Sequence, residues 1–211
     1  MTSYAGPRET LKSGLPAFSF YAALLAAAGL PIYIHAPKVY VDRYGVSLAA
    51  LGSVLFLLRL LDVVQDPLFG RLSERLRHHR GTVTGIATVL MALGMLALFA
   101  VAPPVHPLLW FALALAVVFS SYSLLTINFY AQGVAKAASL GANGHLKVAR
   151  WRETGALLGV ALAAMAPSVL APLTDRPFAG YALGFAVAAA LALYAMRDAW
   201  TSGGLQATTG F

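Results

Sequence analysis

Three charged residues, Arg59, Asp62 and Asp66, lie at helical spacing within an otherwise apolar stretch. In an α-helix, positions i, i+3 and i+7 fall on one face, within about 60° of arc. Two carboxylates one turn apart, with the amide of Gln65 beside them, offer the hard oxygen ligands that suit Na⁺, and a carboxylate also accepts a proton. The alternative is an internal salt bridge, in which Arg59 neutralises one Asp and only links helices.

The composition places this cluster inside a membrane. Hydrophobic residues make up 59% of the 211 residues and charged residues only 11%, whereas a soluble domain carries about a quarter charged residues. A charge at the bilayer centre costs at least about 2.5–3.5 kcal/mol. The three charges must therefore face the bundle interior, a partner or a water-filled cavity. Pairing with Arg59 leaves one carboxylate over, which favours a cation site.

Six segments are long and apolar enough to span a bilayer, which predicts an all-α membrane protein. We expect residues 1–200 to form a single six-helix bundle and residues 201–211 a flexible C-terminal tail. The first segment is too long for a cleaved signal peptide. His35 and His106 lie near the ends of predicted spans, which favours interfacial positions. The predicted spans are Gly14–Ala36, Ser47–Phe69, Gly81–Val101, Pro107–Ala131, Glu153–Leu173 and Pro177–Met196.

The formal net charge of +7 would suggest a nucleic-acid partner in a soluble protein. Here the basic residues gather in alternate loops, as the positive-inside rule describes, so no nucleic acid is expected. This distribution predicts an inner (cytoplasmic) membrane of the bacterial type with both termini in the cytoplasm. The predicted cytoplasmic residues are Arg8, Lys12, Arg71, Arg75, Arg77, Arg80, Lys136, Lys147, Arg150, Arg152 and Arg197. The absence of cysteine excludes disulfides and thiolate metal sites.

The segment from Arg59 to Arg75 resembles the second-helix signature of the glycoside–pentoside–hexuronide:cation symporters, the melibiose-permease-like branch of the major facilitator superfamily. That pattern is Arg-x-x-Asp-x-x-x-Asp-Pro-x-x-Gly, followed by an Asp-Arg pair, where this chain has Glu74-Arg75. The preceding segment, residues 41–47, also resembles the family's loop. The resemblance implies the N-terminal six-helix half of a major-facilitator fold, built from two three-helix repeats.

The resemblance also implies a coupling-ion site for Na⁺ or H⁺. The two carboxylates, Asp62 and Asp66, would bind the ion. Gln65 occupies the intervening amide position, and Ser123 matches the hydroxyl that the fourth span contributes. No other cofactor is implied.

The sugar-binding positions of the family match this chain less well. Arg152 best matches the family's sugar-binding arginine, with Arg150 as the rival, and Tyr130 matches an aromatic position. The acidic residue of the fourth span is replaced by Thr126, and residues 18–21 of the first span contain no acid. A melibiose-like substrate is therefore not expected.

Several further polar residues have structural interpretations. Arg59 would carry a structural charge, and Glu74 and Arg75 resemble the cytoplasmic motif with which the superfamily locks one conformation. Asn128 and Gln132 are expected to link helices rather than to bind a solute.

Twelve-span members bind substrate between two halves. The resemblance implies a half-size secondary transporter that moves a small polar solute, sugar-like or other, with Na⁺ or H⁺. Such a transporter would need a second copy, a separately encoded half or a larger membrane complex, besides the lipid bilayer. The alternative function is a non-transporting accessory subunit built on a transporter half-fold. No Ser/His/Asp arrangement, metal-ligand spacing or nucleotide-binding loop is present, so an enzyme is not expected.

Overall fold

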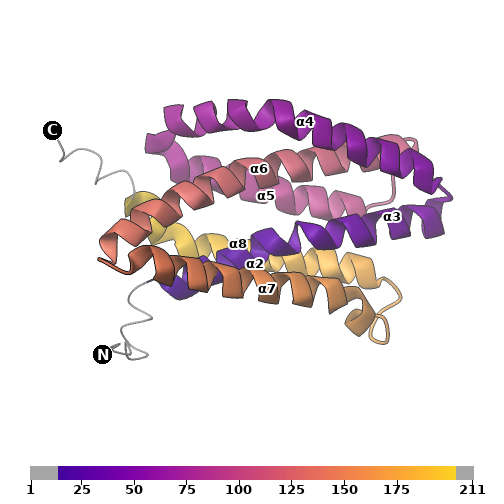
Figure 1. Ribbon diagram of the computed structural model, residues 1–211. Coiled ribbons are helices and arrows are strands. Elements are labelled where there is room, and N and C mark those ends of the chain that lie inside the picture. Colours follow the sequence, from indigo (N-terminus) through magenta and orange to yellow (C-terminus); the bar gives the residue numbers. More distant parts are fainter. Residues whose placement is uncertain (1–13, 203–211) are drawn as a thin grey trace.

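The computed structural model describes residues 14–202, which form a bundle of long helices (Figure 1). Six segments of the described chain are long and apolar enough to cross a membrane, the first being Leu15–Tyr44. This confirms the predicted six-span all-α membrane protein. The helices are α2 (Leu15–Ala27), α3 (Leu30–Tyr44), α4 (Leu48–Arg75), α5 (Arg80–Phe99), α6 (Pro107–Ser139), α7 (Gly144–Leu170) and α8 (Pro177–Ser202), with a short 3₁₀ turn at Arg77–His79.

The first span is broken into α2 and α3 at Ala28 and Gly29. Pro31 lacks an N–H, so it cannot donate to the carbonyl of Ala27 four residues earlier. The hydroxyl of Tyr181, on α8, donates to that oxygen instead, at 2.8 Å. A break inside a spanning helix is tolerated where neighbouring helices satisfy the freed backbone groups.

The helix packing shows part of the internal symmetry of two three-helix repeats. Exchanging the first and fourth, second and fifth, and third and sixth spans maps the main contacts onto one another, although α7 packs on α6 and α8 more extensively than α4 packs on α3 and α5. The helix α2 packs on α7 as α6 packs on α4, and α5 packs on α6 as α8 packs on α2. This arrangement is the one expected of a 3+3 repeat, which the sequence alone did not reveal.

Glycines allow α7 to approach α2 closely. A Cβ added at Gly155 would overlap the backbone of Ser19, and one added at Gly159 would overlap the backbone of Ala23. This small-xxx-small spacing is a common way to pack helices in lipid, where dispersion contacts replace the hydrophobic effect.

The second span, α4, lies at the edge of the bundle, along the top of Figure 1. It packs mainly against α6 and makes few contacts with the other helices. Large apolar side chains on its other faces are exposed, as expected of a lipid-facing or partner-facing helix. These include Phe56, Leu60, Val63, Val64 and Leu68.

Several helices extend beyond the predicted spans. α3 continues to Tyr44, α4 to Arg75, α6 to Ser139 and α8 to Ser202, and α7 begins at Gly144. Residues 132–146, which lie between the predicted fourth and fifth spans, are therefore mostly helical. Hydropathy marks where a helix leaves the apolar layer, and a helix can continue beyond that point with polar residues. Of the predicted tail, residues 203–211 lie outside the described part, as do Arg8 and Lys12.

His35 does not lie at the membrane interface, although an interfacial position was expected. Because the first span continues to Tyr44, His35 lies in the interior of α3 and is buried. Its Nε2 lies 3.1 Å from the carbonyl oxygen of Ala163 on α7, and its ring packs edge-on against Phe178 and Tyr181 of α8. It links three helices. His106 immediately precedes α6 and is exposed, as expected.

The candidate cation-binding cavity

A cavity of about 560 Å³ lies between α3, α4 and α6. The break in the first span forms part of its wall, through Ala28 and Gly29. The three charged residues of α4 line the cavity together, so the helical spacing placed them correctly on one face. The remaining lining residues are Tyr33, Phe119, Tyr122, Ser123, Thr126 and Ile127.

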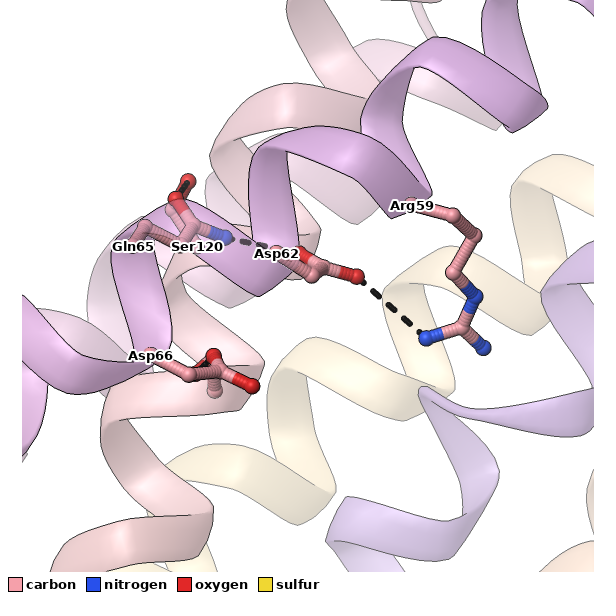
Figure 2. A network of polar contacts seen from close by, with 6 residues as sticks. Arg59, Asp62, Gln65, Asp66 and Ser120 are labelled. Atoms are coloured by element: carbon pink, nitrogen blue, oxygen red, sulfur yellow. Dashed lines mark hydrogen bonds and ion pairs between the residues drawn. The ribbon is translucent and has the colours of Figure 1, made fainter.

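Both carboxylate oxygens of Asp62 have partners (Figure 2). Oδ2 accepts from Nη1 of Arg59 at 3.3 Å, and Oδ1 accepts from Nε2 of Gln65 at 2.7 Å. The side chain of Asp62 is only 16% exposed. Its charge is thus balanced by Arg59 and its orientation is fixed from both sides.

Asp66 has a different environment, one turn further along α4. Its Oδ1 accepts a hydrogen bond from the hydroxyl of Ser123 on α6. Its Oδ2 has no hydrogen-bond partner among the described residues. Among the described residues, Asp66 is therefore the carboxylate of this cluster that has no cationic partner and has an oxygen free for a ligand.

Arg59 is held at the same cavity by an aromatic ring. Its guanidinium lies over Tyr33 of α3, 5.1 Å from the ring centroid, and Tyr33 is stacked on Phe119 of α6 at 5.2 Å. The cation–π contact and the bond to Asp62 hold the guanidinium between α3 and α4. The predicted structural role of Arg59 fits this position.

Gln65 lies behind the cavity wall rather than on it. It is buried, and its Oε1 accepts a hydrogen bond of 2.9 Å from Ser120 of α6. Since its amide nitrogen donates to Asp62, both ends of the side chain have partners. Gln65 thus fixes Asp62 relative to α6, and its role as an ion ligand stays a prediction.

The predicted substrate residues fall into two separate places. Thr126 lines the acidic cavity, and its buried hydroxyl has no hydrogen-bond partner among the described residues. Arg152 and Tyr130 instead line a second cavity of about 400 Å³, formed by α6 and α7 with Phe18 of α2. A single solute would have to contact both cavities to touch all three residues.

Arg152 and its rival Arg150 differ in burial. The side chain of Arg152 is 28% exposed and its guanidinium lies 4.6 Å from the centroid of Tyr130. It also donates two hydrogen bonds to Glu153, at 2.7 and 3.0 Å. Arg150 is exposed and does not line the cavity. The geometry favours Arg152 as the arginine that can meet a ligand.

The proposed gating residues lie at the last turn of α4. Glu74 forms an ion pair of 3.5 Å with Arg77, and both side chains are exposed. Arg75 is exposed as well. Neither Glu74 nor Arg75 contacts the cavity, and their predicted locking role stays untested.

Asn128 and Gln132 link helices, as predicted. Oδ1 of Asn128 accepts a hydrogen bond of 2.8 Å from Ser73, which joins α6 to α4. Nε2 of Gln132 donates to the carbonyl oxygen of Ala199, which joins α6 to α8.

Three further residues belong to this polar system and were not predicted from the sequence, namely Tyr33, Ser73 and Ser120. Ser120 lies one turn before Ser123, and Ser73 lies two turns after Asp66, so helical spacing could have identified both. Nothing in the sequence indicated that Tyr33 would face Arg59. Among the described residues there is no group of three or more His, Asp or Glu side chains that could hold a metal ion.

A family model described as MFS/sugar transport protein matches residues 17–197, which is most of the chain. The chain belongs to this family. The six-span bundle accordingly fits one half of a major-facilitator fold. The description of this family points to a transporter. The match identifies the superfamily and does not distinguish the melibiose-permease-like branch. Comparison with curated proteins gave no match, and comparison with solved structures gave none either.

Proposed function

We propose that this MFS protein is a cation-coupled symporter unit of the glycoside–pentoside–hexuronide type, in which Asp62 and Asp66 bind Na⁺ or H⁺. The observation that carries the proposal is the free Oδ2 of Asp66, which faces a cavity of about 560 Å³. A purely structural salt bridge would need Asp62 and Arg59 only. It would give no reason for a second carboxylate on the same face, because an intramembrane charge is costly.

Ser123 and Thr126 add hydroxyl oxygens on the opposite wall of the cavity. Together with the carboxylates they make an oxygen-only ligand set, the kind that hard cations prefer. Among the described residues, neither a thiol nor an imidazole lines the cavity. This ligand chemistry supports Na⁺ or a proton over a transition metal.

We further propose that a small polar solute, sugar-like or other, binds beside the ion. Thr126 would contact it from the acidic cavity, and Tyr130 and Arg152 from the second cavity. An aromatic ring and a guanidinium are suited to a hydroxylated ring, since one stacks and the other donates hydrogen bonds. A second six-helix unit, either another copy or a separate chain, would cover the two cavities.

The orientation is proposed from the basic residues at one end of the bundle. The described part of this set includes Arg71, Arg75, Arg77 and Arg80 near the α4–α5 connection and Lys136 and Lys147 near the α6–α7 connection. By the positive-inside rule this end would face the cytoplasm of a bacterial-type inner membrane.

Purified protein in proteoliposomes tests the function directly. Uptake of radiolabelled mono- and disaccharides would be measured with an inward Na⁺ gradient, an inward H⁺ gradient, or neither. We expect uptake of at least one sugar to follow one of the two gradients and to be lost in Asp66→Asn. Asp175→Asn, an exposed loop variant, is the matched control. Gradient-independent uptake, or uptake unaffected by Asp66→Asn, would reject cation coupling.

The alternative is a non-transporting accessory subunit. It is favoured by Thr126 in place of the family's acid and by the absence of an acid near Phe18 in the first span. Purification in a mild detergent distinguishes the two. A symmetric dimer supports the transporter, whereas stoichiometric co-purification of other membrane proteins supports the accessory subunit.

A further inference from the structure

The charges that face the acidic cavity do not cancel. Arg59 contributes one positive charge, and Asp62 and Asp66 contribute two negative charges. The other polar side chains on the described wall, Tyr33, Tyr122, Ser123 and Thr126, carry no formal charge. The cavity therefore has a net charge of one negative unit, which one monovalent cation would neutralise.

The positive charge is a fixed part of the wall. Arg59 is anchored by Oδ2 of Asp62 at 3.3 Å and by the ring of Tyr33 at 5.1 Å. Its side chain is nevertheless 62% exposed and lines the cavity. An ion entering beside Asp66 therefore meets the field of this guanidinium as well as that of the carboxylates.

We infer that Arg59 sets the valence of the ion that this site accepts, by acting as a built-in counter-ion for Asp62. This inference rests on the proposed function, because it concerns the selectivity of the same site. With Arg59 present, the charge of Asp62 is balanced, so the two carboxylates together offer one net negative charge to an ion, and the site suits a monovalent cation. Without Arg59, two carboxylates would share the cavity and would suit a divalent cation.

The physical reason is the dependence of electrostatic energy on charge. Repulsion from a fixed guanidinium is twice as strong for a divalent as for a monovalent cation at the same place. Divalent ions also gain most from several carboxylates, and sites tune their affinity by the number of charged ligands. Removing Arg59 removes the repulsion and leaves the charge of Asp62 unbalanced. Both effects increase the affinity for a divalent cation more than that for a monovalent cation.

Charge-altering variants of the full chain, reconstituted in nanodiscs, test this inference. Thermal stabilisation would be titrated with NaCl and with CaCl₂ at constant ionic strength. For Arg59→Gln, with a cavity charge of minus two, we expect the apparent Ca²⁺ affinity to rise by about tenfold or more over the wild type. Arg59→Lys keeps the charge and should keep the wild-type preference. Arg71→Gln removes an exposed arginine of α4 that does not line the cavity, and it should leave the Na⁺ and Ca²⁺ affinities unchanged.

A double variant separates charge from structure. Arg59→Gln combined with Asp62→Asn restores a net charge of minus one and should lose the gain in Ca²⁺ affinity. Asp62→Asn alone gives a neutral cavity and should weaken Na⁺ binding by about tenfold or more. If Arg59→Gln does not fold, retention of wild-type Na⁺ affinity by Asp62→Asn would itself overturn the charge account.

The two proposals fail in different ways. A wild type that shows no response to Na⁺ counts against Na⁺ as the coupling ion. A folded Arg59→Gln protein without a gain in Ca²⁺ affinity, or an equal gain in Arg71→Gln, overturns the valence inference whatever ion the wild type binds.

Discussion

The hydroxyl of Ser123 donates a hydrogen bond to Oδ1 of Asp66 and so joins the middle of α6 to the acidic face of α4. Two further bonds connect the same helices, from Ser120 to Gln65 and from Ser73 to Asn128. Since α4 packs mainly on α6, these bonds fix the position of both carboxylates. The candidate ion site and the attachment of the second span are built from the same residues.

Replacing Ser123 should weaken ion binding without unfolding the bundle. In Ser123→Ala, the site loses one hydroxyl oxygen and Asp66 loses the partner that orients it, and loss of an orienting contact alone changes ion affinity by roughly tenfold to a hundredfold. Ser139→Ala, at the exposed end of α6, is the matched control. Na⁺-dependent thermal stabilisation measures the effect, and equal affinities in the two variants would show that Ser123 does not orient Asp66.

Tyr181 should stabilise the break in the first span. Tyr181→Phe leaves the Ala27 carbonyl without its donor, which should lower the free energy of unfolding by about 0.5–2 kcal/mol. Tyr194→Phe removes the hydroxyl of an exposed tyrosine on the same helix and should have little effect. The free energies of unfolding of the two variants and the wild type would be measured in sodium dodecyl sulfate. If Tyr181→Phe is as stable as Tyr194→Phe, then water or lipid satisfies the carbonyl.

Close packing of α2 on α7 makes Gly159 sensitive to substitution. In Gly159→Ala the new methyl group meets the backbone of Ala23, so α7 must move, at a cost of about 1–3 kcal/mol or more. Gly184→Ala is the control, because its Cβ would meet nothing within 4 Å. The same unfolding assay should show a loss for Gly159→Ala and none for Gly184→Ala, and equal stability would contradict this packing.

Arg152 and Arg150 can be separated by their effect on solute uptake. Arg152→Gln removes the guanidinium that lies on Tyr130 and lines the second cavity, so uptake of a transported sugar should fall by about tenfold or more. Arg150→Gln should leave uptake unchanged because the side chain of Arg150 is exposed and does not line the second cavity. The assay is sugar uptake into proteoliposomes at equal protein content. The opposite order of effects would transfer the assignment to Arg150.

Helical periodicity was enough to place Arg59, Asp62 and Asp66 on one wall, because the angle between residues on one helix depends on spacing alone. It could not place residues of different helices. The break at Gly29 determines how Tyr33 faces Arg59, and the packing of α6 determines that Thr126 and Tyr130 open into different cavities. Both depend on long-range contacts that the sequence does not display. Hydropathy likewise found the spans but not the polar helix ends, such as the start of α7 at Gly144.

Infrared difference spectroscopy of the reconstituted protein tests the central claim, that Asp66 binds the coupling cation. Spectra would be recorded on addition of Na⁺ and on a small pH step, because one response reports Na⁺ binding to a carboxylate and the other reports its protonation. We expect one of these to produce a carboxyl band that disappears in Asp66→Asn and remains in Asp175→Asn. Spectra of Asp66→Asn that match the wild type under both conditions would contradict the account.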